Sequence, residues 1–168
     1  MGNKVLAMKT GVESVKTGLD EKTRKKIAQQ LSKVLADTIL LQIKSQVYHW
    51  NVVGPLFRSL HELTEDHYKD LFKAADDIAE RIRMLGYPAP QSFADLVPKG
   101  DIDEESHLRT AHEMVEQLVA DHERMVRVLR DTAGNAEKND DFATHDLLTE
   151  RLRFHEKAIW MLRAIAAD

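Results

Sequence analysis

The sequence predicts an all-α protein, a four-helix bundle with a short extra helix in a long crossover between its second and third helices. Apolar residues recur at intervals of three and four, as they do along one face of a helix. All four prolines lie between residues 55 and 98, and no alternation of β-branched and polar residues follows Asp101. A chain of 168 residues with 43% apolar residues suits a single domain with a sizeable core.

The first predicted helix begins at Glu21, where the side chain of Asp20 can cap free backbone N–H groups, and it runs to about Trp50. Gly54 and Pro55 then break the helical pattern. Its apolar stripe comprises Ile27, Leu31, Val34, Thr38 and Leu41, with Ile43 as a further candidate. We expect residues 1–20 to form a flexible, basic N-terminal arm and residues 21–168 to form the bundle domain.

The second predicted helix runs from about Arg58 to Leu85 and is ended by Gly86 and the proline that follows at position 88. It is long, and its apolar positions keep helical spacing throughout. They are Leu60, Leu63, His67, Leu71, Ala74, Ile78, Ile82 and Leu85. An unbroken stripe of this length predicts a helix that buries one face along the whole bundle.

The segment 87–100 contains three prolines but also three large apolar residues, Phe93, Leu96 and Val97. This combination predicts a short packed helix inside the crossover. The third predicted helix starts near Asp103 and ends before Gly134, and the fourth runs from about Asp140 to the end of the chain. Their apolar stripes comprise Leu108, Ala111, Val115, Leu118, His122, Met125 and Leu129 in the third, and Leu148, Leu152, His155, Ile159 and Leu162 in the fourth.

Charge and residue types limit the classes of function. The formal net charge is −4 at pH 7, so affinity for nucleic acid has to reside in a local patch. There are no cysteines, which excludes a disulfide scaffold and thiolate metal sites and leaves His, Asp and Glu as candidate ligands. Neither a signal peptide nor an apolar stretch of about 18 residues is evident, so we expect a cytoplasmic protein with no membrane partner.

A polar stripe lies beside the apolar one on the predicted second helix. It consists of His61, Glu65, Asp76 and Glu80, which fall within a sector of about 100° around the helix axis. Glu65 and Asp76 are about 16 Å apart along that axis, far beyond the ~2 Å length of a metal–ligand bond. One helix therefore cannot bring all four side chains to the same ion.

A second copy of the chain removes this difficulty. If two copies of the helix pack antiparallel about a two-fold axis, residues face each other when their numbers have a constant total. The pairs His61 with Glu80 and Glu65 with Asp76 both total 141, so both come into register when the axis passes between residues 70 and 71. Symmetry then creates two equal sites in each dimer.

His49 completes the candidate metal site. It ends the first helix, and an antiparallel hairpin brings it to the same end of the bundle as His61. Together with Glu65 of the same chain and Asp76 and Glu80 of its mate, these imidazoles suit non-haem iron, and zinc or copper would bind the same ligands. The alternative is that Asp76 and Glu80 are solvated helix charges and that His61 is a surface residue near the helix start.

The residues around these candidates resemble the motifs of a known family. Residues 46–57, 60–62 and 76–81 are similar to the HWNVxGxxF, LHE and DxxAER motifs of Dps-type miniferritins. The resemblance extends over about residues 31–160 and implies a ferritin-like bundle assembled into a hollow dodecamer, with ferroxidase centres at two-fold interfaces. The iron ligands that it implies are His49, His61, Glu65, Asp76 and Glu80. Glu65 departs from the pattern, because many members carry Asp there.

The resemblance also implies an enzymatic activity, that of a ferroxidase. Fe(II) would be oxidised, preferentially by hydrogen peroxide, and stored as a ferric mineral, which protects DNA from Fenton chemistry. Trp50, beside His49, would donate electrons to radicals formed near the iron; the alternative is a large apolar residue packed in the bundle. We expect Trp160 in the core. The acidic residues at the start of the fourth helix would line three-fold pores or, alternatively, cap the helix; they are Asp140, Asp141, Asp146 and Glu150.

Two other classes of function stay open at this point. One is a DNA-compacting nucleoid protein with secondary iron activity, because the N-terminal region has seven positive residues against three negative ones. The positive residues are Lys4, Lys9, Lys16, Lys22, Arg24, Lys25 and Lys26. The other is a metal-free helical bundle that acts through protein contacts alone. A salt-dependent gel shift tests the first alternative, and metal analysis of the purified protein tests the second.

Overall fold

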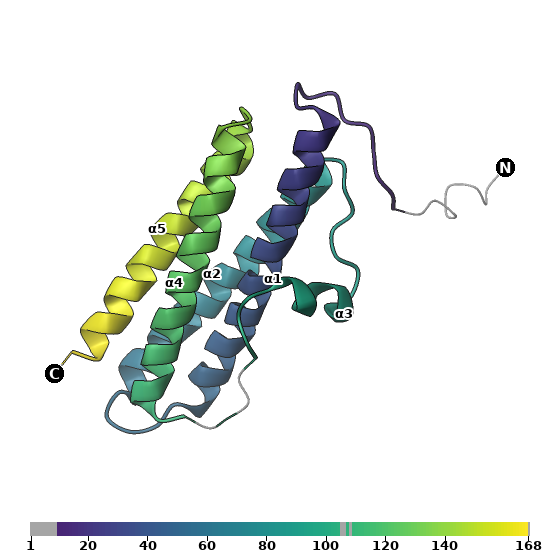
Figure 1. Cartoon of the computed structure of the whole chain (residues 1–168). Helices are drawn as coiled ribbons and strands as arrows, with labels where there is room; N and C mark the ends of the chain where they lie inside the picture. The colour runs from purple at the N-terminus through teal and green to yellow at the C-terminus, as the bar shows by residue number, and fades with distance from the viewer. Residues whose placement is uncertain (1–9, 105–106, 108, 168) are drawn as a thin grey trace.

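The computed structural model describes residues 10–104, 107 and 109–167. Within these ranges it contains helices and no strand, and it confirms the predicted all-α bundle with a short helix in the crossover. The elements are α1 (Glu21–Asn51), α2 (Phe57–Met84), α3 (Phe93–Leu96), the 3-10 turn η2 (Val97–Lys99), α4 (Ala111–Glu137) and α5 (Phe142–Ile165). Figure 1 shows two antiparallel hairpins, α1 with α2 and α4 with α5, and places α3 beside α1.

Local chemistry explains the bounds of the first hairpin. The side chain of Asp20 accepts a hydrogen bond of 2.9 Å from the backbone N–H of Thr23 and so caps α1, as predicted. After Asn51 the chain turns at Gly54, whose φ of +91° lies in the left-handed region that glycine adopts without strain. This tight turn sends α2 back along α1, which brings the end of one helix beside the start of the other.

The third long helix, α4, begins at Ala111 and not near Asp103, so the predicted start was wrong. Thr110 and Glu113 form a capping box: the backbone N–H of Thr110 donates to the Glu113 carboxylate at 2.7 Å, and the Thr110 hydroxyl accepts from the Glu113 N–H at 3.3 Å. A threonine followed three residues later by glutamate is the signal that fixes this start. The predicted stripe residue Leu108 lies outside the described residues.

The predicted end of the third long helix before Gly134 was wrong, whereas the predicted start of the last helix at about Asp140 agrees with α5, which begins at Phe142. The helix passes through Gly134, which costs only about 1 kcal/mol, and ends at Glu137. Asp141 then caps α5 by accepting from the Thr144 N–H at 3.1 Å, and its carboxylate pairs with Arg81 of α2 at 2.6 Å. Because Asp141 is buried, the capping alternative holds for this residue.

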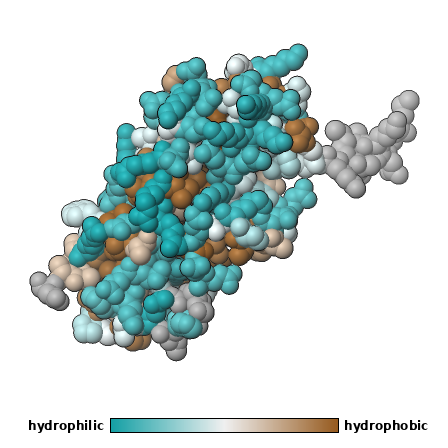
Figure 2. All heavy atoms as spheres, viewed as in Figure 1, coloured by the Kyte–Doolittle hydropathy of each residue, from teal (hydrophilic) through white to brown (hydrophobic). Residues whose placement is uncertain are grey.

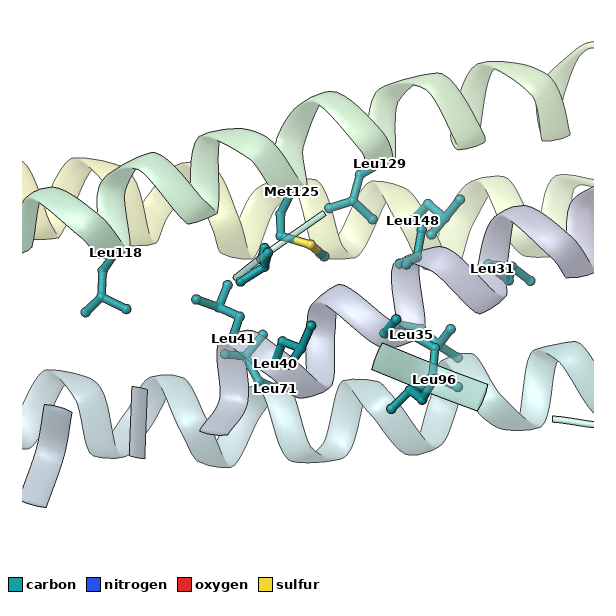
Figure 3. Packing of buried hydrophobic residues seen from close by; sticks show 14 of the residues in the cluster. Leu31, Leu35, Leu40, Leu41, Leu71, Leu96, Leu118, Met125, Leu129 and Leu148 are labelled. Atoms are coloured by element: carbon teal, nitrogen blue, oxygen red, sulfur yellow. The ribbon is translucent and has the colours of Figure 1, made fainter. Parts of the chain in front are cut away.

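The core is a continuous apolar cluster to which all four long helices contribute. Figure 3 shows leucines of several helices and Met125 pointing into this shared interior. The predicted stripes of α1 and α2 are buried, except that Ile43 is exposed. Leu96 of α3 is buried, whereas Phe93 is exposed, so only part of the short helix packs as predicted.

Trp160 is 67% exposed on α5, so its expected place in the core was wrong. Its neighbours in the helical pattern explain this, because Leu162 and Ala158 take the inward positions on either side of it. Figure 2 shows a mostly hydrophilic face with separate apolar areas. None of the described helices is long and apolar enough to cross a membrane.

The described part of the N-terminal arm lies against the far end of α2. The backbone N–H of Glu13 donates to the carbonyl of Gly86 at 2.8 Å, and the Glu13 carboxylate pairs with Arg83. A Cβ atom at Gly86 would lie 2.5 Å from the Glu13 carbonyl oxygen, so this close approach requires glycine. Residues 1–9 lie outside the described residues, and the boundary at residue 20 stays a prediction.

Candidate metal centre

His49 and His61 come together at the turn between α1 and α2, as predicted. Their rings are stacked with centroids 3.7 Å apart. The Nδ1 atom of His49 lies 2.8 Å from the carbonyl oxygen of His61, and the Nδ1 atom of His61 lies 2.8 Å from the carbonyl oxygen of His49. The His49 carbonyl is available because it belongs to the last turn of α1, where carbonyls lack partners within the helix.

These two contacts fix the tautomer of both rings. A carbonyl oxygen only accepts hydrogen bonds, so the Nδ1 atoms of His49 and His61 carry the protons and donate. In the neutral rings the lone pair is then on Nε2, the atom that faces away from the backbone. Histidines that bind metals are typically oriented in this way, by a bond from the other ring nitrogen to a carbonyl or carboxylate. The pair thus offers two nitrogen ligands without further rearrangement.

Aromatic side chains enclose the two histidines. The Phe57 ring stacks on His61 with centroids 5.0 Å apart, and the Tyr68 ring meets His49 edge-on at 5.4 Å. Trp50 is 65% exposed in the single chain, so it is not packed inside the bundle. The packed alternative for Trp50 is therefore wrong, while its role as an electron donor stays a prediction.

Glu65 lies one turn after His61 and is close enough to both histidines for their charges to act on it. The pKa of the Glu65 carboxyl is lowered, chiefly by a hydrogen bond from Lys69 and by the charge of that lysine, and further by His49 and His61. The same contact raises the pKa of Lys69. In the single chain the Glu65 carboxylate is thus engaged by the Lys69 ammonium group.

Asp76 and Glu80 lie on the same helix, exposed and far from the histidines. Glu80 is about 28 Å from His61 along the axis of α2. Among the residues that the structure describes, no three His, Cys, Asp or Glu side chains converge closely enough to hold a metal ion. The single chain therefore presents two separated sets of candidate ligands. His49, His61 and Glu65 lie at one end of α2, and Asp76 and Glu80 lie toward the other.

The prediction from sequence missed two residues on this face. Lys69 pairs with Glu65, and Phe72, near the middle of α2, is 71% exposed. Lys69 could have been found from its spacing, because residues four apart on a helix are neighbours. Phe72 could have been found as a large apolar residue on the polar stripe.

A second group of histidines lies inside the bundle and is not part of this face. His67, His122 and His155 occupy predicted core positions, and the Nδ1 atoms of His122 and His155 are 2.8 Å apart. Burial lowers the pKa of His67 to about 4 and lowers the pKa values of His122 and His155 well below the usual 6.5. These neutral rings pack with Phe154, so we assign them to the core.

Comparison with known proteins identifies the family. The model of the ferritin-like domain matches residues 28–168. A low temperature-induced protein from Nostoc sp. is 40% identical over 158 residues, which cover 89% of this chain and 85% of that protein. DNA protection during starvation protein 2 from Bacillus anthracis is 36% identical over 140 residues, which cover 83% of this chain and 96% of that protein.

A solved structure extends the likeness to the whole bundle. The Dps protein from Vibrio cholerae, described as a member of a superfamily of ferritin-like diiron-carboxylate proteins, is 29% identical with a TM-score of 0.84. The match covers 94% of this chain and 97% of that one. These matches agree with the resemblance found in the sequence motifs. They also agree with the fold described above, which has two helical hairpins, a helical crossover and two histidines at the first turn. The chain belongs to the Dps family of ferritin-like proteins.

Proposed function

We propose that this protein binds Fe(II), oxidises it at a centre shared by two subunits, and stores the ferric product inside a hollow dodecamer. Membership of a ferritin-like family supports iron storage and protection of DNA in general. The observation that carries the specific proposal is the pair His49 and His61, whose Nδ1 atoms are both bound to carbonyls so that both Nε2 atoms are available.

The missing ligands would come from a second copy. In an antiparallel two-fold packing of α2, Glu80 of one subunit faces His61 of the other, and Asp76 faces Glu65, because both pairs of numbers total 141. The exposure of Asp76 and Glu80 supports this arrangement, since exposed carboxylates are accessible to a second subunit. The combined set of two imidazoles and three carboxylates suits non-haem iron.

An apolar groove supports packing on this side of the molecule. It has a volume of about 660 Å³ and is lined by side chains of α1, α2 and the crossover, including Phe72, Phe93 and Asp76. Exposed apolar side chains around a groove are typical of a surface that another subunit covers. We propose that a second copy covers this groove and thereby delivers its own carboxylates to the first subunit's histidines.

Hydrogen peroxide is the oxidant that we propose. It accepts one electron from each of two Fe(II) ions and, with two protons, becomes two water molecules, so no hydroxyl radical is released. Oxidation in this way would remove both reagents of Fenton chemistry and would protect DNA in the cytoplasm. Stopped-flow mixing of Fe(II) protein with peroxide and, separately, with oxygen should show the faster reaction with peroxide. A faster reaction with oxygen would overturn the choice of oxidant and leave the shared centre unaffected.

The decisive experiment mixes two inactive variants. His61→Ala and Glu80→Ala should each abolish rapid Fe(II) oxidation, although the two residues are about 28 Å apart in one chain. In a dimer with one subunit of each kind, one site lacks both ligands and the other is intact. Shells reassembled at random from equal amounts should regain about a quarter of the wild-type rate, because half of the dimers are mixed and each restores one of two sites.

Two results would contradict the proposal. If mass spectrometry confirms mixed dimers and no oxidation returns, the sites are not shared between subunits. Assembly is checked independently by light scattering, where twelve chains of 19.2 kDa form a particle of roughly 230 kDa. A stable monomer at micromolar concentration would remove both the shell and the shared centre.

Binding of DNA through the N-terminal arm is a separate proposal. Lys16, Lys22 and Lys25 are exposed, which favours contact with phosphates, but Arg24 is buried and donates to the Leu85 carbonyl at 2.8 Å. The usable positive charge is therefore smaller than the sequence indicates. A gel shift that weakens steeply with salt in the full chain, and that is lost when Lys16, Lys22 and Lys25 are all replaced by Gln, would support it.

A further inference from the structure

Lys69 lies on the same face of α2 as the proposed iron ligands. Taking His61 as the origin, it falls at about 80° around the helix axis, inside the sector of about 100° that contains Glu65, Asp76 and Glu80. Its ammonium group forms an ion pair with the Glu65 carboxylate one turn earlier on the helix. The positive side chain that contacts Glu65 therefore belongs to the same face as the proposed ligands.

The ion pair holds the Glu65 carboxylate against the Lys69 ammonium group. Although Glu65 lies next to His49 and His61, it does not converge with them into a cluster of three ligands among the described residues. The long glutamate side chain can reach Lys69, whereas an aspartate at the same position would be shorter by one methylene. The departure from aspartate noted in the sequence thus coincides with a contact that competes for the ligand.

The packing proposed above would strengthen this competition. Lys69 and Phe72 also total 141, so the same two-fold axis sets Lys69 opposite the partner subunit's Phe72. In the single chain the Lys69 side chain is 61% exposed and Glu65 37%, which leaves the pair screened by water. An apolar ring that covers the pair would lower the local dielectric constant, and an ion pair is stronger in such surroundings.

We infer, on the basis of the proposed iron centre, that Lys69 is a tethered competitor that occupies Glu65 in the empty site and must be displaced when Fe(II) binds. Lys69 holds the Oε1 atom of Glu65, so an ion that binds this carboxylate competes with one Lys69–Glu65 pair. Lys69 thereby sets how tightly the centre holds a divalent ion. It is a positioning residue, since it acts on iron only through Glu65.

The test uses Co(II), which reports binding by its visible absorption and by titration calorimetry without any oxidation. In assembled shells at low salt, Lys69→Met should tighten Co(II) binding by about five- to tenfold, because the Glu65 carboxylate no longer has to leave an ion pair before it binds the ion. High salt should reduce this difference, since it screens the lysine. The matched control is Lys73→Met, which removes the same charge from the next turn of α2 without touching Glu65.

A second pair of variants separates the specific contact from general electrostatics. Glu65→Asp keeps a carboxylate ligand but shortens it away from Lys69, so adding Lys69→Met to this variant should change Co(II) affinity by less than about twofold. Unchanged or weaker Co(II) binding by Lys69→Met would overturn the inference, as would equal effects of Lys69→Met and Lys73→Met. Lys69→Gln provides the same comparison if the methionine variant fails to assemble.

The Glu80→Ala variant shows whether a negative result refutes only the role inferred for Lys69 or also the proposed shared centre. If wild-type shells bind Co(II) and Glu80→Ala shells do not, the centre stands and the lysine variants judge the inference alone. If Glu80→Ala binds Co(II) as the wild type does, the shared centre is wrong, and the role assigned to Lys69 is wrong with it.

Discussion

At the scale of single residues, the most consequential contact outside the metal centre is a buried ion pair. Lys44 of α1 and Asp121 of α4 approach to 2.6 Å, and their side chains are 3% and 2% exposed. The amide of Gln117 also donates to both carboxylate oxygens at 3.2 Å. Removing two charges from water is costly, and this cost is recovered only while both partners are present.

Replacing Asp121 with Asn should therefore destabilise the protein strongly. The Lys44 ammonium group would stay buried without its counter-charge, and the free energy of unfolding should fall by about 3–5 kcal/mol. Urea unfolding at one fixed protein concentration measures the change. The control Asp131→Asn alters an exposed residue of the same helix and should change stability by less than about 0.5 kcal/mol. Equal effects of the two substitutions would show that the buried pair is not needed.

The two tryptophans show why residue-level burial was hard to predict. Apolar character and helical spacing place a residue near the apolar stripe of its helix. They do not show how much of the helix surface beside that stripe the neighbouring helices cover. Trp160 lies between inward positions of α5 and is nevertheless exposed, and Trp50 is exposed at the end of α1. In both cases the residue type suggested the core, whereas the direction of the side chain decided otherwise.

At the scale of elements, the crossover is tied to the bundle by one buried carboxylate. Asp37 of α1 accepts from the backbone N–H groups of Asp101 and Ile102 at 2.6 and 2.9 Å. Gly100 lies so close that a Cβ atom there would be 2.7 Å from the same carboxylate. Lys33 pairs with Asp101 at 2.6 Å beside this contact. These bonds fix the segment that leads from η2 to α4.

Asp37→Ala should loosen this segment and lower the free energy of unfolding by about 1–3 kcal/mol, because two backbone N–H groups lose their acceptor. Hydrogen exchange of the amides of Asp101 and Ile102 should accelerate more than exchange in the middle of α4. The exposed Asp103 provides the control, and Asp103→Ala should leave these amides unchanged. Protection that persists in Asp37→Ala would mean that other contacts hold the crossover.

Most elements could be predicted because long amphipathic helices leave a clear periodic pattern. The stripes of α1 and α2 were correct at nearly every position because they face a continuous core. The predicted start of α4 was wrong because Leu108 continues the helical spacing before Ala111 in the sequence, while the Thr110–Glu113 box fixes the real boundary. The burial of Asp37 could not be predicted, since its partners are backbone groups 64 and 65 residues away.

At the scale of the whole molecule, the buried histidines should make the subunit sensitive to acid. The pKa values of His122 and His155 are lowered by burial, so the folded protein favours their neutral forms. The unfolded chain takes up protons below about pH 6.5, and stability is then lost as the pH falls from there toward the folded pKa values. For His67, with a folded pKa of about 4, the loss at pH 5 is about 2 kcal/mol.

Replacing His122 and His155 together by Leu should make stability less dependent on pH. Changing both rings at once leaves neither Nδ1 atom without its partner. The fall in unfolding free energy between pH 7.5 and pH 5 should be smaller in this variant than in the wild type, by about 2 kcal/mol or more. His112→Gln, at an exposed histidine, should keep the wild-type dependence. An unchanged dependence in the double variant would assign acid sensitivity to other groups.

Iron has to reach the inside of the proposed shell, and we propose that acidic residues at the start of α5 line its path. Asp146 and Glu150 are exposed, in contrast to Asp141, which is committed to the helix cap and to Arg81. Asp146→Asn with Glu150→Gln should slow Fe(II) uptake several-fold at low ionic strength, because the attraction for cations is reduced, while the particle mass stays the same. Neutralising the exposed Glu116 and Asp131 of α4 instead should leave uptake unchanged. Equal rates for both double variants would remove the pore from this position.

The residues of the candidate centre could be proposed from the sequence because most of them repeat along one helix. His61, Glu65, Asp76 and Glu80 share a face that helical geometry alone defines. The tautomers of His49 and His61 could not be predicted, because they depend on carbonyl groups that meet only when the turn forms. The ion pair between Lys69 and Glu65 could be predicted, because the two residues are four apart on one helix. Spacing alone does not show that this ion pair would compete with metal binding by Glu65.

The reciprocal hydrogen bonds of His49 and His61 form when the hairpin of α1 and α2 folds, before any ion or second subunit is present. The entropy lost in holding the two rings is therefore part of the cost of folding and not part of the cost of binding. A newly made subunit would carry half of each centre already rigid. Docking then does not have to order these rings, and chelation of a metal by both of them should stabilise the closed hairpin further, because an ion that binds only the folded form favours that form.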